Sequence, residues 1–126
     1  MVVICLKKGI LMNKPILDEE SVSAAKQIMK GKFPTMLQYF LEDTDAYLMR
    51  MRTGMAEKKT EEIVSTAHTI KSSSLQIGAV RMSDIAQEIE EAARAQVENG
   101  CCDREFFAPL VTRLEETFAA TKAAFK

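Results

Sequence analysis

The stretch TEEIVSTAHTIKSSSLQIGA, residues 60–79, decides the fold of this chain. At about 100° per residue, its apolar and small side chains fall on a stripe roughly 80° wide. The members of this stripe are Ile63, Ala67, Ile70, Ser74 and Ile77. Such a stripe is typical of a helix that buries one face. The pattern predicts a helix over 60–77, with Thr60 as its N-cap and Gly78 in the turn that follows.

The flanking segments carry the same kind of pattern. The chain has only 5 Gly and 3 Pro, and strong helix formers dominate it. Apolar spacing predicts further helices within 17–31, 34–53, 79–99 and 103–125, with breaks at Gly31–Pro34, Gly54, Gly78 and Gly100. In the first helix the apolar stripe is Val22, Ala25, Ile28 and Met29; in the second it is Met36, Leu37, Phe40, Leu41, Leu48 and Met51.

Particular residues mark the ends of these helices. Asp18 is the expected N-cap of the first helix, and Pro34 suits the first turn of the second. Pro109 predicts a kink in the last helix or a later start to it. The whole pattern indicates an all-α protein, an antiparallel up-down four-helix bundle with a short additional N-terminal helix.

Length and composition favour one soluble domain over 15–126, preceded by a flexible N-terminal tail over 1–14. The formal net charge is −1, so we expect no nucleic-acid partner. The apolar opening is too short to span a bilayer, so we expect no membrane association. Three cysteines, two of them adjacent, with one histidine argue against a disulfide framework and a zinc site. We therefore expect a cytoplasmic protein.

His68, the only histidine, lies roughly 140° from the centre of the predicted buried stripe, so it faces solvent or a partner. Its neighbours on that side are Val64, Lys71, Ser72 and Leu75. Three consecutive serines, residues 72–74, reduce helix propensity in mid-helix. The plain interpretation is a solvated surface histidine among tolerated serines.

A second interpretation gives these residues a chemical role. A neutral imidazole is a good nucleophile near neutral pH and can accept a phosphoryl group. A lysine one turn away would offset the new negative charge, and small neighbours would let a second protein approach. These features favour a phosphoryl carrier that works by docking over an enzyme with its own pocket.

The stretch AHTIKSSSLQIGA resembles the signature of histidine-containing phosphotransfer (HPt) domains, A-H-x-L-K-G-[SA]-[SA]-x-x-[IL]-G-[AL]. The matching residues are Ala67, His68, Lys71, Ser73, Ser74, Ile77, Gly78 and Ala79, with Ile70 in place of Leu. In the next helix, IAQEIEEAAR resembles the family's continuation, with Glu90 and Arg94 at its acidic and basic positions. The resemblance covers roughly residues 16–125. Ser72 departs from it, because the family usually has Gly there.

The resemblance implies a phosphorelay intermediate. His68 would be the phosphoacceptor, Lys71 an electrostatic helper and Ser72 the small neighbour of the phosphoryl group. The expected partners are response-regulator receiver domains and a hybrid sensor histidine kinase, which would dock on a face made of Val64, Lys71, Ser72 and Leu75 around His68. We expect a monomer without cofactor or metal, because the Mg²⁺ of such a relay belongs to the receiver. The sequence has no Gly-rich phosphate loop, so we expect no kinase activity.

Other interpretations stay open at this stage. A helical adaptor that binds a receiver or another signalling partner without being phosphorylated has the Gly-to-Ser departure in its favour. An all-helical dimerisation module is a third possibility. Glu90 and Arg94 lie four residues apart, so a surface ion pair within one helix accounts for them equally well.

Overall fold

The computed structural model describes residues 14–125 of the 126-residue chain. Its elements in these residues are α2 (Glu19–Met29), the short 3₁₀ helix η1 (Lys30–Lys32), α3 (Phe33–Ala56), α4 (Thr60–Ile77), α5 (Val80–Glu98) and α6 (Arg104–Ala124). The all-α prediction is confirmed. Apart from Lys14, the predicted tail lies outside the described residues, and the domain boundary at residue 15 stays a prediction.

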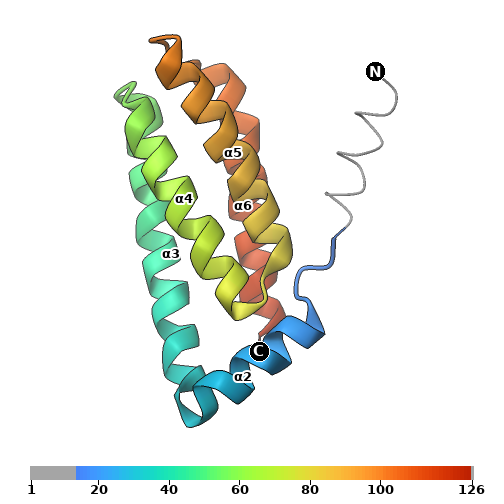
Figure 1. The fold of residues 1–126 in the computed structure, drawn as a ribbon. Coiled ribbons are helices and arrows are strands. Elements are labelled where there is room, and N and C mark those ends of the chain that lie inside the picture. Colours follow the sequence, from blue (N-terminus) through green and yellow to red (C-terminus); the bar gives the residue numbers. More distant parts are fainter. Residues whose placement is uncertain (1–13, 126) are drawn as a thin grey trace, which may run out of the picture.

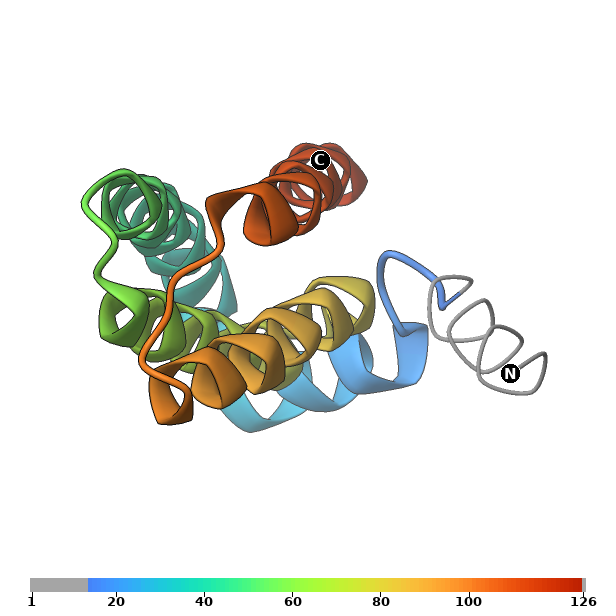
Figure 2. The ribbon, with the colours of Figure 1, turned by 90° about the horizontal axis from the view of Figure 1, so that it is seen from above.

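Helices α3 to α6 form an antiparallel up-down bundle, and α2 lies across its lower end (Figure 1). Seen from above, α3 and α6 lie on one side of the bundle, and α4 and α5 lie on the other (Figure 2). The most extensive contacts are between α4 and α5. Within residues 14–125, no helix is both long enough and apolar enough to cross a bilayer.

The core runs along the axis of the bundle, and α4 contributes the stripe expected from its sequence. Its members Ile63, Ala67, Ile70, Ser74 and Ile77 are all buried. The stripes expected on the first two helices are only partly correct. Ile28 and Met36 are exposed, whereas Ala25, Phe40, Leu48 and Met51 are buried. Both exposed residues lie near the α2–α3 connection.

One predicted N-cap is confirmed and one is wrong. The side chain of Asp18 accepts a hydrogen bond from the backbone N–H of Ser21 and caps α2. Helix α4 has Lys59 at its N-cap position, without a side-chain cap. Thr60 is the first helical residue, and its hydroxyl donates to the carbonyl of Cys101 at 3.0 Å. The hydroxyl therefore joins the start of α4 to the α5–α6 connection instead of capping its own helix.

Two other expected breaks lie inside helices. Helix α3 continues through Gly54, where an added Cβ would lie 3.0 Å from Cβ of Glu62 and 3.2 Å from the Lys59 carbonyl. Gly54 thus allows α3 and α4 to approach closely. Helix α6 begins at Arg104, so Pro109 lies inside it and the later start is wrong. The expectations for Pro34 and Gly100 hold, since Pro34 lies in the first turn of α3 and Gly100 follows α5.

The connection between α4 and α5 fixes how these two helices face each other. Gly78 ends α4 in the left-handed conformation, with φ of 90°. The N–H of Ala79 donates to the Ser74 carbonyl and that of Gly78 to the Leu75 carbonyl, which is a Schellman motif. Only two residues separate the helices, so α5 returns directly along α4.

Candidate functional site

His68 lies in the middle of α4, on the side that the sequence predicts, and 55% of its side chain is exposed. The short connection after α4 decides what lies opposite it. In an antiparallel hairpin, residues at equal distances from the turn lie side by side. His68 lies ten residues before Gly78 and Glu90 eleven residues after Ala79, so α5 brings the Glu90 carboxylate beside the imidazole.

The side chain of Glu90 is buried, with 6% exposed, and three side chains bind its carboxylate. Nδ1 of His68 lies 3.0 Å from Oε2. Nζ of Lys71 lies 3.0 Å from Oε1. Arg94 donates to Oε2 from Nε at 3.0 Å and from Nη2 at 2.6 Å. Glu90 thus joins α4 to α5 and holds two cations beside His68.

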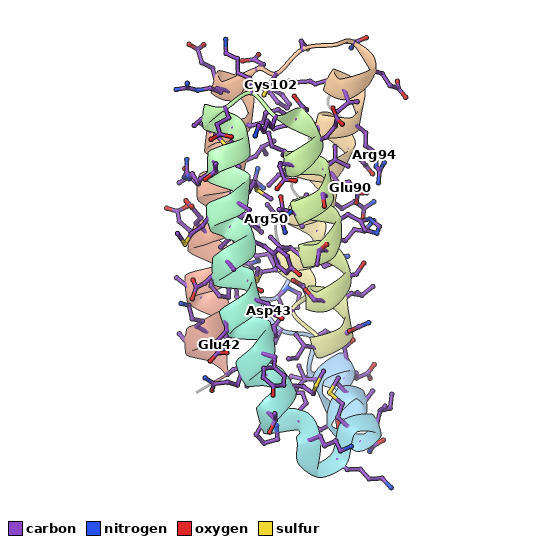
Figure 3. All side chains as sticks on the ribbon, turned by 90° about the vertical axis from the view of Figure 1, so that its left-hand side faces the viewer. Glu42, Asp43, Arg50, Glu90, Arg94 and Cys102 are labelled. Atoms are coloured by element: carbon purple, nitrogen blue, oxygen red, sulfur yellow. The ribbon has the colours of Figure 1, made fainter. Side chains whose placement is uncertain are left out.

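The plain surface pair between Glu90 and Arg94 is therefore not what the structure contains. Arg94 is exposed, but its partner is a buried carboxylate that is shared with a second helix. Figure 3 shows Glu90 and Arg94 on the same side of the bundle. Cys102, a free thiol like its neighbour Cys101, lies at the end of the bundle opposite α2, where α5 connects to α6.

The protonation state of Glu90 follows from these contacts. Burial alone raises the pKa of a carboxyl group, but hydrogen bonds from Arg94, Lys71 and His68 outweigh it and lower the pKa of Glu90 to about 2. At neutral pH the carboxylate is therefore ionised and can only accept hydrogen bonds. In the neutral imidazole, Nδ1 of His68 then carries the ring proton and donates to Oε2, and Nε2 keeps a free lone pair on the exposed ring.

The other predicted site residues lie around His68 on the same face. Val64 is half-buried against the core, whereas Ser72 and Leu75 are exposed. Lys71 keeps 30% of its side chain exposed. Its backbone carbonyl accepts a hydrogen bond from the hydroxyl of Ser83 at 3.0 Å, which fixes α5 against α4 beside the site.

This arrangement provides a nucleophile on an open surface. Nε2 of His68 has a lone pair, and a buried carboxylate holds the opposite edge of the ring. In residues 14–125, no group of three or more His, Cys, Asp or Glu side chains is placed to bind a metal ion. The chemistry that the geometry supports is acceptance of an electrophilic group that a docked partner presents.

The sequence placed His68, Lys71 and Ser72 together but left the position of Glu90 open. One signal was available. If α4 and α5 form a hairpin about Gly78 and Ala79, counting outward from the turn pairs residue 68 with residue 89, directly beside Glu90. That count needs the length of the connection, which helix periodicity alone does not define.

The chain was compared with known proteins. Residues 35–124 match the family model described as Hpt domain. A similar solved structure is the crystal structure of histidine-containing phosphotransfer protein B (HptB) from Pseudomonas aeruginosa PAO1, at 26% sequence identity and a TM-score of 0.77. That similarity covers 90% of this chain and 93% of the HptB chain. A search of curated proteins gave no match.

Proposed function

This chain belongs to the Hpt domain family, whose function is histidine phosphotransfer in a phosphorelay, and we propose that His68 carries the phosphoryl group. A phospho-aspartate on one response-regulator receiver domain donates it, and an aspartate on a second receiver accepts it. A hybrid sensor histidine kinase begins the relay. The observation that carries this proposal is the Glu90 carboxylate on Nδ1 of His68, because it leaves Nε2 free on an exposed ring.

The transfer step balances with the groups that the two proteins supply. The lone pair of Nε2 attacks phosphorus, the N–P bond forms, and the P–O bond of the acyl phosphate breaks. The aspartate leaves as a carboxylate. The proton on Nδ1 stays in place, so the ring gains positive charge as the N–P bond forms. Glu90, at 3.0 Å from Nδ1, offsets that charge, and the reverse sequence returns the phosphoryl group to a receiver.

Lys71 supports the transfer by its charge. A phosphoryl group brings about two negative charges to His68, and the ammonium of Lys71 lies one helical turn away beside Glu90. Any Mg²⁺ in the step belongs to the receiver. The docking face consists of Val64, Lys71, Ser72 and Leu75, where Leu75 offers exposed apolar area and Ser72 leaves room beside the ring. We also propose that the chain acts as a monomeric carrier in the cytoplasm.

The first test is phosphoryl transfer from receiver domains that have been phosphorylated with acetyl phosphate and Mg²⁺. The wild type and His68→Gln are incubated with each receiver in parallel. We expect a label that is stable in base and labile in acid on the wild type and none on His68→Gln. His68 is exposed on α4, so the variant should keep its helical circular dichroism.

The result that would overturn the proposal is a folded wild-type chain that no receiver labels. If such a chain still bound a receiver, and His68→Ala bound it equally well, the protein would be an adaptor without a phosphorylation step. Equal labelling of wild type and His68→Gln would place the phosphoryl group on another residue.

The role of Lys71 has its own test with a matched control. Lys71→Ala removes the cation beside the ring, and we expect the transfer rate to His68 to fall about tenfold. Lys122→Ala removes a cation from α6, where it lies over the ring of Phe118, and should leave the rate unchanged. Rates measured by quenched-flow labelling would contradict the role if both variants behaved alike.

A further inference from the structure

The hydroxyl groups around His68 are not equivalent. Thr69 donates to the carbonyl of Ser65 at 3.0 Å, and Ser73 donates to the carbonyl of Thr69 at the same distance. Both are thus bonded to the backbone of their own helix, as is common for such residues in helices. Among residues 14–125, the hydroxyl of Ser72 has no hydrogen-bond partner, and the residue is exposed. Its donor remains available.

Ser72 is also the hydroxyl with the right position. It lies four residues after His68, so the two Cβ atoms are about 5–6 Å apart on one face of α4. Side chains on a helix lean toward its N-terminus, so Ser72 leans toward His68. Ser73 lies a further 100° or so around the helix, and its hydroxyl is already occupied.

In the described part of the chain, the charged groups around the imidazole of His68 all lie at its Nδ1 edge, so the Ser72 hydroxyl has no competitor among them at Nε2. Glu90 takes the Nδ1 edge of the ring, so an added group must sit on Nε2, at the exposed edge. Lys71 is bound to Oε1 of Glu90 at 3.0 Å, and both bonds of Arg94 go to Oε2. The free ring nitrogen therefore belongs to the exposed part of the ring, and Ser72 lies one helical turn away with its hydroxyl unoccupied.

We propose that the hydroxyl of Ser72 donates a hydrogen bond to a phosphoryl oxygen on Nε2 of His68 and so stabilises the phosphorylated form of this chain. The inference rests on the proposed function, because it requires that His68 is phosphorylated. In the free protein the hydroxyl bonds water. In the phosphorylated protein it meets an anionic oxygen, and hydrogen bonds to ionised acceptors are stronger than neutral ones. The bond exists in only one of the two states, so it shifts the equilibrium between them.

The equilibrium constant of transfer separates this role from a role in partner fit. The transfer reaction converts a phosphorylated receiver and the free chain into a free receiver and the phosphorylated chain. Its equilibrium constant depends only on the free energies of these four separate proteins and not on the docked complex. A residue that merely fits the docked partner changes the forward and reverse rates by the same factor. A residue that binds the phosphoryl group changes their ratio, whichever receiver is used.

The experiment measures forward and reverse transfer with one purified receiver that labels the wild type. Ser72→Ala should shift the equilibrium toward the receiver about 3- to 10-fold, the range expected for one hydrogen bond to a charged group near solvent. Ser72→Thr keeps the hydroxyl and should recover part of the loss. Ser73→Ala removes a neighbouring hydroxyl that is bonded to Thr69, and should leave the equilibrium unchanged.

Each outcome decides between the roles. If the wild type is labelled and Ser72→Ala has the wild-type equilibrium constant, the inference is wrong, even where both of its rates have changed. If Ser72→Ala and Ser73→Ala shift the equilibrium equally, the effect belongs to the helix and the inference is again wrong. If no receiver labels the folded wild type, the proposed function itself fails. Alanine favours helix more than serine, so Ser72→Ala should fold.

Discussion

The carboxylate of Glu90 fixes the positions of the charged side chains around His68. It is buried and ionised, and it is bonded to His68, Lys71 and Arg94. A buried carboxylate is tolerated only where donors replace the water that it loses. Here two cations and an imidazole N–H replace that water, so charge balance in the site depends on contacts between α4 and α5.

Glu90→Gln should remove an acid-dependent part of the stability. Because the pKa of Glu90 is lowered to about 2 in the folded chain from an ordinary value of 4.5, its contribution is complete above pH 4.5. It is lost as the pH falls toward 2, and amounts to roughly 3 kcal/mol. Urea unfolding of wild type and Glu90→Gln should therefore differ by about that much at pH 6 and converge at pH 2. A difference in unfolding free energy between wild type and Glu90→Gln that stays the same from pH 6 to pH 2 would contradict this contribution.

Glu91→Gln is the control for this series. Glu91 is the next residue on α5, is exposed, and accepts a hydrogen bond only from Gln87 among the described residues. Its stability curve should follow that of the wild type across the same pH range.

At the scale of the element, the two faces of α4 have different surroundings. One face is buried in the bundle core, and the other presents His68 and Ser72 to solvent. The buried face holds the helix in place, so the exposed face can carry small polar residues of poor helix propensity. Tertiary packing thus supports a composition that an isolated helix would not favour.

Ile70→Ala should destabilise the fold by about 2–5 kcal/mol, because Ile70 is fully buried and its loss leaves a cavity. Gln76→Ala, at an exposed position of the same helix, should change the free energy of unfolding by less than about 0.5 kcal/mol. Thermal or urea denaturation measures both. Similar losses in the two variants would contradict the assignment of the buried face.

Gly78→Ala should destabilise the end of α4 by at least about 2 kcal/mol. Gly78 has φ of 90°, and a Cβ there would lie 2.6 Å from Cγ2 and 2.9 Å from the backbone N of Val22 on α2. Gly31→Ala is the matched control, because nothing lies within 4 Å of a Cβ at Gly31. Differential scanning calorimetry should show a lower melting temperature for Gly78→Ala only.

At the scale of the whole molecule, residues 14–125 show no single helix that gathers the exposed apolar side chains into a face for a second copy. The large apolar side chains that are exposed in residues 14–125 lie on all five α-helices. They are Ile28, Met36, Tyr39, Met49, Leu75, Val97 and Phe106. Stable homodimers bury continuous apolar surface, and apolar residues scattered singly over a surface are normal for a monomer.

The chain should therefore behave as a monomer of 14.1 kDa in solution. Size-exclusion chromatography with light scattering, run from about 10 µM to 1 mM, should give one mass throughout. A mass that rises with concentration toward twice this value would contradict the prediction. It would also favour the dimerisation module that the sequence left open.

The sequence by itself determined the helices and the face of α4 that carries His68. Periodic burial on α4 and the spacing of His68, Lys71 and Ser72 are local properties of one helix, so residue numbers alone define them. The same pattern carries the likeness to HPt domains, which the family match confirms. The helix stripe was less accurate at Ile28 and Met36, where the chain turns.

Only the tertiary structure decided the rest. Thr60 bonds to the Cys101 carbonyl in the α5–α6 connection instead of capping α4. Gly54 lies inside α3, where its missing Cβ leaves room for Glu62 and Lys59. Both outcomes depend on contacts with another helix or connection. The burial of Glu90 and its place on Nδ1 of His68 depend on the two-residue turn between α4 and α5. Contacts between helices depend on the register and distance of their axes, and a pattern that repeats within one helix contains neither quantity.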